Sequence, residues 1–556
     1  MHFRVLNGWF SGCARTVGRS PKNARWLSAS LRLAAHQAAE PLKSLLNNFQ
    51  KQHLGFWVIV ALLCLPCFVG EAAQSSVRPN IVVILADDLG YGDLGCYNSQ
   101  SKIPTPRLDQ LARQGLRFTD AHSPSAVCTP TRYALLTGRY PWRSRLKTGV
   151  LRPYDPPLIE ADRMTLPTLL KQQGYATAIV GKWHLGWDWP TTDGRAAAIT
   201  AEGMDNVDYS KPVANGPLTR GFDFYFGTDV PNYPPYVFIE NDRTLGVPGE
   251  PAPIIKGAIN RKGPMVKGWE PVKILPTLTE RAVRYVDERA KNKQPFFLYF
   301  ALTSPHYPVV PSPEFIGKSR AGVYGDFVAQ TDAAVGAVLD ALKRNGFDKN
   351  TLVIFTSDNG PEVVELEVGA YERIRQSQHA SMLNWRGVKR DNWEGGHRVP
   401  FIARWPGRIP AGKTSDALIG HIDLMATLAS LTKSTLPDSA APDSYDQSPV
   451  LLGQRRKQPI RQTLVHHQIN GHLALRQGDW VLIDSKTCGD GNKEPEWFRR
   501  ERAAHDCTGE AALYNLRDDP AQTKNLYDTQ SAKARELKTL LDQFRQNERT
   551  APQNSR

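Results

Sequence analysis

The sequence has few acidic residues at its start, and it lacks the patterns that mark nucleic-acid-binding proteins. Residues 1–53 contain one acid, Glu40, against eight lysines and arginines, so this segment carries +7 of the formal net charge of +14. The chain from Gln74 onward carries +8, which fits an anionic substrate and fits equally well a merely basic surface. Zinc-finger spacing and basic–aromatic repeats are absent, so no nucleic acid is expected as a partner.

Long apolar runs are also scarce, and the most conspicuous one follows the basic segment. It is "LGFWVIVALLCLPCFVG" at 54–70, and the small residues of "GEAAQSS" come next. A positive region, an apolar core and small residues are the order of a secretory signal, which predicts export to a periplasmic, secreted or lysosome-like compartment. Two alternatives to a cleaved signal stay open. The apolar segment could be retained as a membrane anchor, and only then would the protein contact a membrane. The basic segment could also be a transit peptide. Residues 1–73 are interpreted as leader and signal or anchor segment.

Cysteine is sparse, and only four of the seven cysteines follow Gln74. In an exported protein Cys488 could pair with Cys507, and Cys96 could pair with Cys128.

The surroundings of Cys128 suggest a use other than a disulfide. In "CTPTR" Pro130 fits the first turn of a helix, and we expect Thr129 to be its N-cap. Because a helix N-terminus favours anions, the thiol is expected to be a nucleophile facing an anion site.

From residue 80 short β-branched or aromatic runs alternate with helical segments, and each run ends in polar residues. The runs begin "NIVVILADD", "YATAIVGKWH", "PFFLYFALTSPH" and "TLVIFTSDNG". This alternation predicts an α/β fold with a large doubly wound mixed sheet flanked by helices. Ligands bind beyond the carboxyl ends of such strands. We therefore expect one polar cluster there, formed by Asp87, Asp88, Lys182, His184, His306, Asp358 and Asn359.

A change in composition at 432–449, rich in Ser, Pro and Asp, predicts a boundary. We expect a catalytic α/β domain over 74–435, a linker over 436–449 and a smaller C-terminal α+β subdomain with an antiparallel sheet over 450–556. The hairpin-like alternation of "HLALRQGDWVLI" and the closing amphipathic segment "SAKARELKTLLDQFRQNE" support the third part.

Two acidic pairs predict a metal site. Asp87–Asp88 and Asp358–Asn359 offer three carboxylates and one amide oxygen, which are ligands for Ca²⁺ or Mg²⁺ rather than zinc. Adjacent carboxylates resist joint ionisation unless a cation is present. Isolated acids at strand ends often cap helices instead, but two pairs at equivalent strand ends favour the metal.

Positive and titratable side chains complete the predicted site. Lys182 is directed at the cluster by its strand, whereas position alone says little about Lys389, and both are candidates for holding an anion. Arg132 could orient a neighbouring group, and His184 and His306 are placed for proton transfer. The remaining histidines considered have no comparable placement and are expected to be structural: His397, His421, His466 and His467.

The motif "CTPTR", extended by "YALLTGR", resembles the C-x-P-x-R signature of the sulfatase family. The blocks "PNIVVILADDLGYGD", "GKWHLG", "TSPH", "SDNG" and "WEGGHRVPFIARWPG" are similar to the family's other blocks and follow the family's order. "GDWVLI" and "ALYNLRDDPAQTKNL" resemble its C-terminal subdomain. The similarity covers 78–548 and is strongest to the arylsulfatase branch of the alkaline-phosphatase-like superfamily. His397 departs from the pattern, since many relatives have an aliphatic residue there.

The resemblance implies an activity and a cofactor. It implies hydrolysis of a sulfate monoester, on a small molecule or a glycan, by a hydrate of formylglycine, which a formylglycine-generating enzyme makes from Cys128. With residue 128 consumed, Cys488 and Cys507 are the pair left for a disulfide. A phosphonate or phosphate ester hydrolase of the same superfamily and an inactive glycan-binding homologue are the alternatives.

The resemblance also implies a role for each matched residue. One Ca²⁺ and the sulfate would be bound by Asp87, Asp88, Asp358 and Asn359. Lys182 and Lys389 would hold sulfate oxygens, and Arg132 would hold the hydrate. His306 would protonate the leaving alcohol, and His184 would help deprotonate the second hydroxyl, which expels sulfate.

Overall fold

The structure is a computed structural model that describes residues 78–552 except 293, 364–368, 490–493, 506 and 508. The predicted leader and apolar segment over 1–73 lie outside the described residues. Among the helices of the described part, none is long and apolar enough to cross a membrane.

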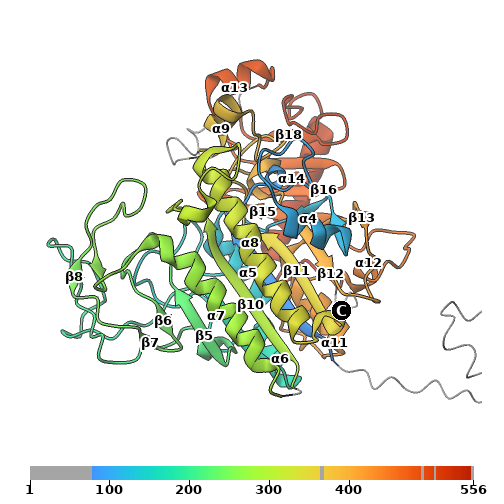
Figure 1. The fold of residues 1–556 in the computed structure, drawn as a ribbon. Helices are drawn as coiled ribbons and strands as arrows, with labels where there is room; N and C mark the ends of the chain where they lie inside the picture. Colours follow the sequence, from blue (N-terminus) through green and yellow to red (C-terminus); the bar gives the residue numbers. More distant parts are fainter. Residues whose placement is uncertain are drawn as a thin grey trace, which may run out of the picture. The chain divides into compact units, whose positions relative to one another are not determined.

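A ten-stranded mixed sheet positions the predicted site (Figure 1). Its central strands are parallel and run in the order β11-β1-β10-β4-β5. The antiparallel strands β12 and β6 extend the two edges, which makes the sheet mixed, as predicted. In spatial order the strands are β13 (Lys413–Ser415), β2 (Leu116–Phe118), β12 (Phe401–Arg404), β11 (Thr351–Ser357), β1 (Asn80–Asp87), β10 (Phe296–Pro305), β4 (Ala176–Lys182), β5 (Phe224–Thr228), β6 (Ile239–Glu240) and β7 (Arg243–Thr244).

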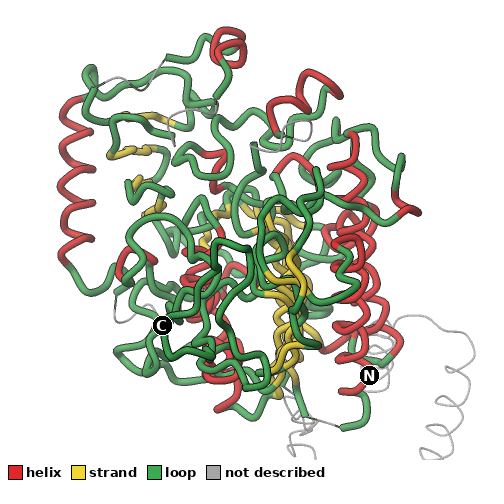
Figure 2. The backbone as a smooth tube through the Cα atoms, turned by 90° about the vertical axis from the view of Figure 1, so that its left-hand side faces the viewer, coloured by secondary structure: helices red, strands yellow, loops and turns green. Residues whose placement is uncertain are grey.

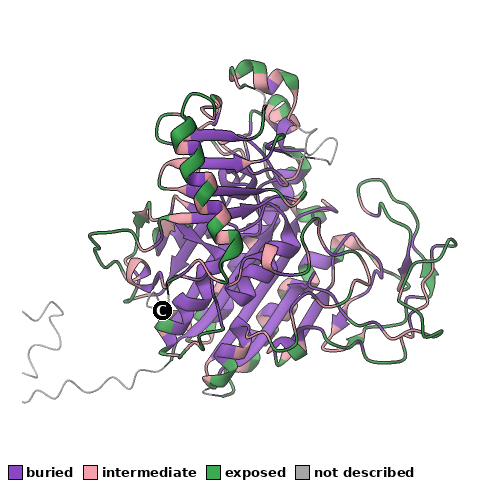
Figure 3. Cartoon of the chain, turned by 180° about the vertical axis from the view of Figure 1, so that it is seen from behind, coloured by how far each residue is buried: buried purple, intermediate pink, exposed green. Residues whose placement is uncertain are grey.

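The central strands are continuous apolar runs because both faces of the sheet are covered. In β1 the side chains of Ile81, Val83 and Leu85 belong to one hydrophobic core, and those of Val82 and Ile84 belong to the other. Figure 2 views the sheet nearly edge-on with helices on both sides, and Figure 3 shows its strands buried. The prediction of a doubly wound α/β fold is therefore confirmed.

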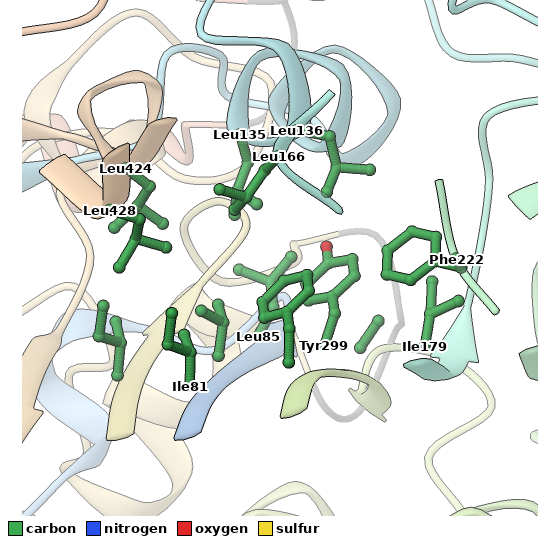
Figure 4. Packing of buried hydrophobic residues seen from close by; sticks show 14 of the residues in the cluster. Ile81, Leu85, Leu135, Leu136, Leu166, Ile179, Phe222, Tyr299, Leu424 and Leu428 are labelled. Carbon is green, nitrogen blue, oxygen red and sulfur yellow. The ribbon is translucent and has the colours of Figure 1, made fainter. Parts of the chain in front are cut away.

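A different set of helices covers each face of the ten-stranded sheet. The side of Ile81 packs against α5, α6 and α11, and Figure 4 shows Leu135, Leu166 and Leu424 of these helices above Ile81 and Leu85. The side of Val82 packs against α4, α7 and α8. The bounds of these helices are α4 Pro106–Arg113, α5 Cys128–Thr137, α6 Leu166–Gln172, α7 Ile274–Arg289, α8 Gly322–Arg344 and α11 Leu424–Thr432.

A second, four-stranded antiparallel sheet forms in the C-terminal part, as predicted. Its strands are β15 (Thr463–His467), β16 (Leu473–Gln477), β17 (Trp480–Asp484) and β18 (Ala512–Asn515). Helix α14 (Ser531–Gln546) packs on this sheet through Ala534, Leu537 and Leu541, which recur at helical spacing on one face. The same core includes Ala134 of α5, so the small sheet contacts the back of the helix that begins at Cys128.

Short elements connect these layers. They are β3 (Ala121–His122), which pairs with β14 (Ile419–Gly420), β8 (Glu250–Pro251), which pairs with β9 (Pro264–Met265), and the helices α9 (Ala370–Ser377), α10 (Glu394–His397), α12 (Ser448–Leu451) and α13 (Glu496–Glu501). In the predicted linker over 436–449, Ala441 and Asp443 are buried, and Asp443 accepts a hydrogen bond from Arg143 Nε at 2.9 Å. The domain bounds stay a prediction.

Candidate active site

The carboxyl ends of the parallel strands bring the predicted polar residues together. Asp87 ends β1, Lys182 ends β4, and Asp358 follows β11 directly. All three side chains are fully buried. Buried charges are stable only when they are paired, so their contacts define the site.

Two cations hold the carboxylates of Asp87 and Asp358. Lys182 Nζ donates to Asp87 Oδ2 at 2.7 Å. Arg132 Nη2 donates to Asp358 Oδ2 at 2.8 Å and lies 3.6 Å from Asp87 Oδ2. Arg132 Nη1 also donates to the backbone oxygen of Lys182 at 3.2 Å, which fixes the guanidinium between the two strands.

A second set of contacts surrounds Asp88. Its backbone has a φ of 66°, a left-handed conformation that turns the chain sharply after β1. Asn359 Nδ2 donates to Asp88 Oδ1 at 2.7 Å, and Lys389 Nζ donates to Asp88 Oδ2 at 2.8 Å. Lys389 also lies 3.4 Å from Glu362 Oε2. The structure therefore places Lys389, about which its position in the sequence said little, in the cluster.

The oxygen atoms of this cluster fit a hard divalent cation. Asp87 Oδ1 and Asn359 Oδ1 are buried and have no hydrogen-bond partner among the described residues. Burial and the neighbouring charge of Asp87 raise the pKa of Asp358 well above its usual range. Burial alone would raise the pKa of Asp87 as well. The positive charges of Lys182, His306 and Arg132 outweigh burial and hold that pKa below the ordinary value. A bound cation would coordinate the two free oxygens and relieve the repulsion between the carboxylates.

Cys128 is the first residue of α5 and is almost completely buried. Its thiol is near enough to influence the pKa values of Lys182, Arg132 and Lys389, so it belongs to the same cluster. The prediction that Thr129 is the N-cap is wrong, because the N-cap is Val127. The Thr129 hydroxyl instead accepts a hydrogen bond from the backbone N–H of Leu151 at 3.3 Å.

The two predicted proton-transfer histidines contact different partners. His306 Nε2 lies 3.7 Å from Asp88 Oδ2, and its Nδ1 is 2.6 Å from the backbone oxygen of Tyr307. His184 Nε2 is 3.0 Å from the backbone oxygen of Leu151, and its Nδ1 is buried without a described partner. Burial lowers the pKa of His306 to about 4, and burial together with Lys182 lowers that of His184 to about 3.

Two acids near the site were missed from the sequence. Glu362 approaches Lys389, and Asp229 Oδ1 accepts a hydrogen bond from the backbone N–H of His184 at 3.1 Å. Glu362 follows "SDNG" by two residues, but nothing in the pattern ties it to a lysine 27 positions later.

The disulfide expected between Cys488 and Cys507 is present. Cys96 and Cys128 are not bonded to each other or to any other described cysteine. The thiol of residue 128 is therefore not held in a disulfide.

Comparisons with known proteins agree with this geometry. The sulfatase family model matches residues 79–434. An N-acetylgalactosamine-6-O-sulfatase of Bacteroides thetaiotaomicron is 34% identical over 509 residues, covering 85% of this chain and 94% of the relative. Arylsulfatase A of Bos taurus is 35% identical over 490 residues, covering 84% and 86%. A solved structure reported for glycosaminoglycan metabolism by Bacteroides thetaiotaomicron has a TM-score of 0.72 at 31% identity, covering 85% of this chain and all of that one.

The chain belongs to the sulfatase family. It is a sulfuric ester hydrolase.

Proposed function

We propose that the chain hydrolyses a sulfate monoester by a calcium- and formylglycine-dependent mechanism. The observation that carries this proposal is the convergence of Lys182, Lys389 and Arg132 on three carboxylates beside Cys128. Two buried oxygens, Asp87 Oδ1 and Asn359 Oδ1, are left for a metal. Asp87, Asp88, Asp358 and Asn359 would hold one Ca²⁺.

The bound groups supply part of the chemistry. A Ca²⁺ ion held by Asp87, Asp88, Asp358 and Asn359 would neutralise charge on the sulfate group. Formylglycine made from Cys128 would, as its hydrate, offer one hydroxyl as nucleophile and a second hydroxyl for sulfate release.

The chain's own residues bind and orient the substrate. Lys182 and Lys389 present cationic Nζ atoms to sulfate oxygens, and Arg132 positions residue 128 from the next turn of α5. Because its pKa is lowered, His184 is neutral at neutral pH. The Nε2–H group of His184 donates to Leu151, so its Nδ1 keeps a lone pair that can accept a proton from residue 128.

His306 is the proposed donor of a proton to the leaving alcohol. Its Nδ1–H donates to the backbone oxygen of Tyr307, which leaves Nε2 on the side of Asp88. The protonated ring needed for this step is a minor form in the free site, since burial lowers its pKa to about 4. The negative sulfate ester raises that pKa when it binds beside the ring.

We propose a sulfated carbohydrate as the physiological substrate. The relatives named above include a carbohydrate sulfatase at 34% identity, and the solved structure at 31% identity was reported for glycosaminoglycan metabolism. The excess of positive charge from Gln74 onward supports a polyanionic ligand. We also propose that the protein is exported, because a disulfide such as Cys488–Cys507 persists in oxidising compartments.

Purified protein, co-expressed with a formylglycine-generating enzyme, tests this proposal on paired aryl sulfate and aryl phosphate esters and on sulfated glycosaminoglycan oligosaccharides. We expect turnover of the sulfate ester to exceed that of the phosphate ester and sulfate release from an oligosaccharide. A clear preference for phosphate would contradict the sulfatase mechanism. No turnover by protein that carries the aldehyde and calcium would favour a binding role instead.

A further inference from the structure

The loop that follows β5 brings an aromatic side chain to the active site. Asp229, which directly follows β5, accepts a hydrogen bond from the backbone N–H of His184 at 3.1 Å. Four residues later, the ring of Tyr233 lies edge-on to the ring of His184, with the two centroids 6.1 Å apart. His184 is buried and Tyr233 is half-buried. Tyr233 therefore lies beside a proposed proton-transfer group at a point where the chain reaches the surface.

The same loop approaches the other proton-transfer histidine at its far end. Burial raises the pKa of Tyr236 to about 12, and Tyr307, which follows His306 in the chain, is close enough to contribute to the rise. Residues 229–236 therefore run along the site from His184 to the segment that carries His306.

Backbone contacts hold Arg261 against this loop. Tyr236 Oη donates a hydrogen bond to the backbone oxygen of Arg261 at 2.9 Å, and the backbone N–H of Tyr236 donates to the backbone oxygen of Pro264 at 2.9 Å. The backbone N–H of Val266 donates to the backbone oxygen of Tyr236 at 3.1 Å. Figure 1 shows the segment that carries β8 and β9, which includes Arg261, beyond the β6 edge of the sheet. The backbone of Arg261 is thus fixed, although its side chain is exposed.

The guanidinium group of Arg261 lies over the ring of Tyr233. Its Cζ is 4.4 Å from the ring centroid, which is the geometry of a cation–π contact. Because that ring lies 6.1 Å from the ring of His184, Arg261 Cζ is at most 10.5 Å from the centroid of His184. A substituent on the sugar next to the reacting one covers a distance of this order.

The N–H groups of Arg261 are only partly used within the described part of the chain. There its side chain donates to two uncharged oxygens, the backbone oxygen of Asn232 at 3.4 Å and Asn260 Oδ1 at 3.2 Å, and both bonds come from Nη1. Nε and Nη2 have no described partner, and together they form one edge of the planar guanidinium. Such an edge matches two oxygens of a carboxylate or a sulfate, and stacking on an aromatic ring leaves it open to them.

We propose that Arg261, stacked on Tyr233, binds a second anionic group of the substrate. This group is a carboxylate or a sulfate on the sugar next to the one whose sulfate ester is cleaved. The proposal rests on the proposed hydrolysis of a sulfated carbohydrate, and it adds a preference for sugar chains with an anionic neighbour. Tyr233 holds the guanidinium in place before the substrate binds, which reduces the entropy lost on binding. Arg261 is a specificity-determining residue, because it contacts the neighbouring sugar and not the reacting atoms.

Steady-state kinetics on matched substrates test the proposal. The substrates are an aryl sulfate, a sulfated disaccharide whose neighbouring sugar is a uronate, and the same disaccharide with the carboxylate reduced to an alcohol. We expect wild type to have a kcat/KM about tenfold higher on the uronate than on the reduced disaccharide, since a hydrogen bond to a charged group contributes an energy of this order. A disaccharide with a second sulfate in place of the carboxylate shows which of the two anions binds better.

Arg261→Gln should remove the preference for the anionic disaccharides. Their KM should rise about tenfold with kcat nearly constant, because the contact is the same in the ground state and the transition state. Arg261→Lys keeps the charge without the planar edge and should lie between wild type and Arg261→Gln. Added salt should weaken the preference of wild type and leave Arg261→Gln unaffected. Lys256→Gln removes one exposed positive charge from the same segment and is the matched control, with the kinetics of wild type.

Three results would overturn the proposal. The first is an equal loss by Arg261→Gln on the anionic and the reduced disaccharides, which would mean that the residue does not recognise the anion. The second is wild-type kinetics that do not distinguish these disaccharides, and the third is hydrolysis of the aryl sulfate alone. No turnover of any substrate by protein that carries the aldehyde and calcium would instead contradict the proposed function, and this subsite with it.

Discussion

Lys182 Nζ lies 2.7 Å from Asp87 Oδ2, and both side chains are fully buried at the carboxyl end of the central sheet. The pair forms because β4 and β1 are both neighbours of β10 and end at the same edge. The pair keeps the positive charge of Lys182 in the site, where the proposed mechanism uses it to hold sulfate oxygens.

Replacing Lys182 by methionine should abolish most of the activity. The variant keeps the volume of the side chain but removes a charge that binds sulfate, so we expect kcat to fall about 10²- to 10³-fold. Asp87 loses its nearest cation and keeps only the longer contact with Arg132 Nη2 at 3.6 Å, and breaking a buried ion pair of this kind costs about 3–5 kcal/mol of folding free energy. Steady-state kinetics and chemical denaturation measure the two effects. Lys291→Met, at an exposed lysine, is the control and should change neither.

Removal of calcium should lower both activity and stability. Without the cation, Asp87 and Asp358 repel each other inside the protein, and a ligand at 100 times its Kd contributes about 2.7 kcal/mol to stability. Chelation followed by differential scanning fluorimetry should show a lower Tm that Ca²⁺ restores. Asp358→Asn should blunt this response, whereas Asp416→Asn, at an exposed acid, should keep it. An unchanged Tm in wild-type protein on complete chelation would argue against the metal site.

The Cys488–Cys507 disulfide should stabilise the C-terminal part. The two cysteines are 19 residues apart, and closing a loop of this size contributes about 3 kcal/mol in the chain-entropy account. The double variant Cys488→Ala/Cys507→Ala should therefore unfold at lower denaturant concentration than wild type. Cys96→Ala removes a cysteine that forms no disulfide and serves as the control. Equal midpoints for the double variant and wild type would contradict the prediction.

Buried neutral histidines should make the protein acid-sensitive. Burial, with a smaller contribution from His122, lowers the pKa of His421 from 6.5 to about 3. The unfolded chain binds a proton at this residue below pH 6.5, but the folded chain does so only near pH 3. The free energy of unfolding therefore falls as the pH falls through this window, by up to about 1.4 kcal/mol per pH unit. His421→Gln removes the titration and should flatten the slope measured by denaturation at several pH values; an unaltered slope would refute this assignment.

The strand ends were predictable from the sequence, and the contacts across the sheet were not. β-branched runs that end in Asp87, Lys182 and Asp358 define parallel strands by composition alone. The strands β2 and β12, which lie between the parallel strands and the edge strand β13, are short, and their antiparallel pairing depends on tertiary packing. The start of α5 was misjudged because the Thr129 hydroxyl bonds to the segment at Leu151 rather than to its own helix.

The meeting of three buried histidine rings was equally hidden from sequence reasoning. These residues are His122, His397 and His466, which are separated by 275 and 69 positions. Each one alone is indistinguishable from a structural histidine. Only the packing of β15 beside the loop at Ser123 brings them together, through the hydrogen bond from the His467 N–H to the Pro124 oxygen. No local pattern encodes that contact.

The central claim is that residue 128 is formylglycine in the active enzyme. Mass spectrometry of the tryptic peptide Phe118–Arg132, taken from protein that hydrolyses an aryl sulfate, tests this claim most directly. We expect the mass of a peptide in which an aldehyde or its hydrate replaces the thiol of Cys128, and we expect Cys128→Ala to be inactive yet folded. An unmodified or disulfide-bonded Cys128 in protein with full activity would contradict the account.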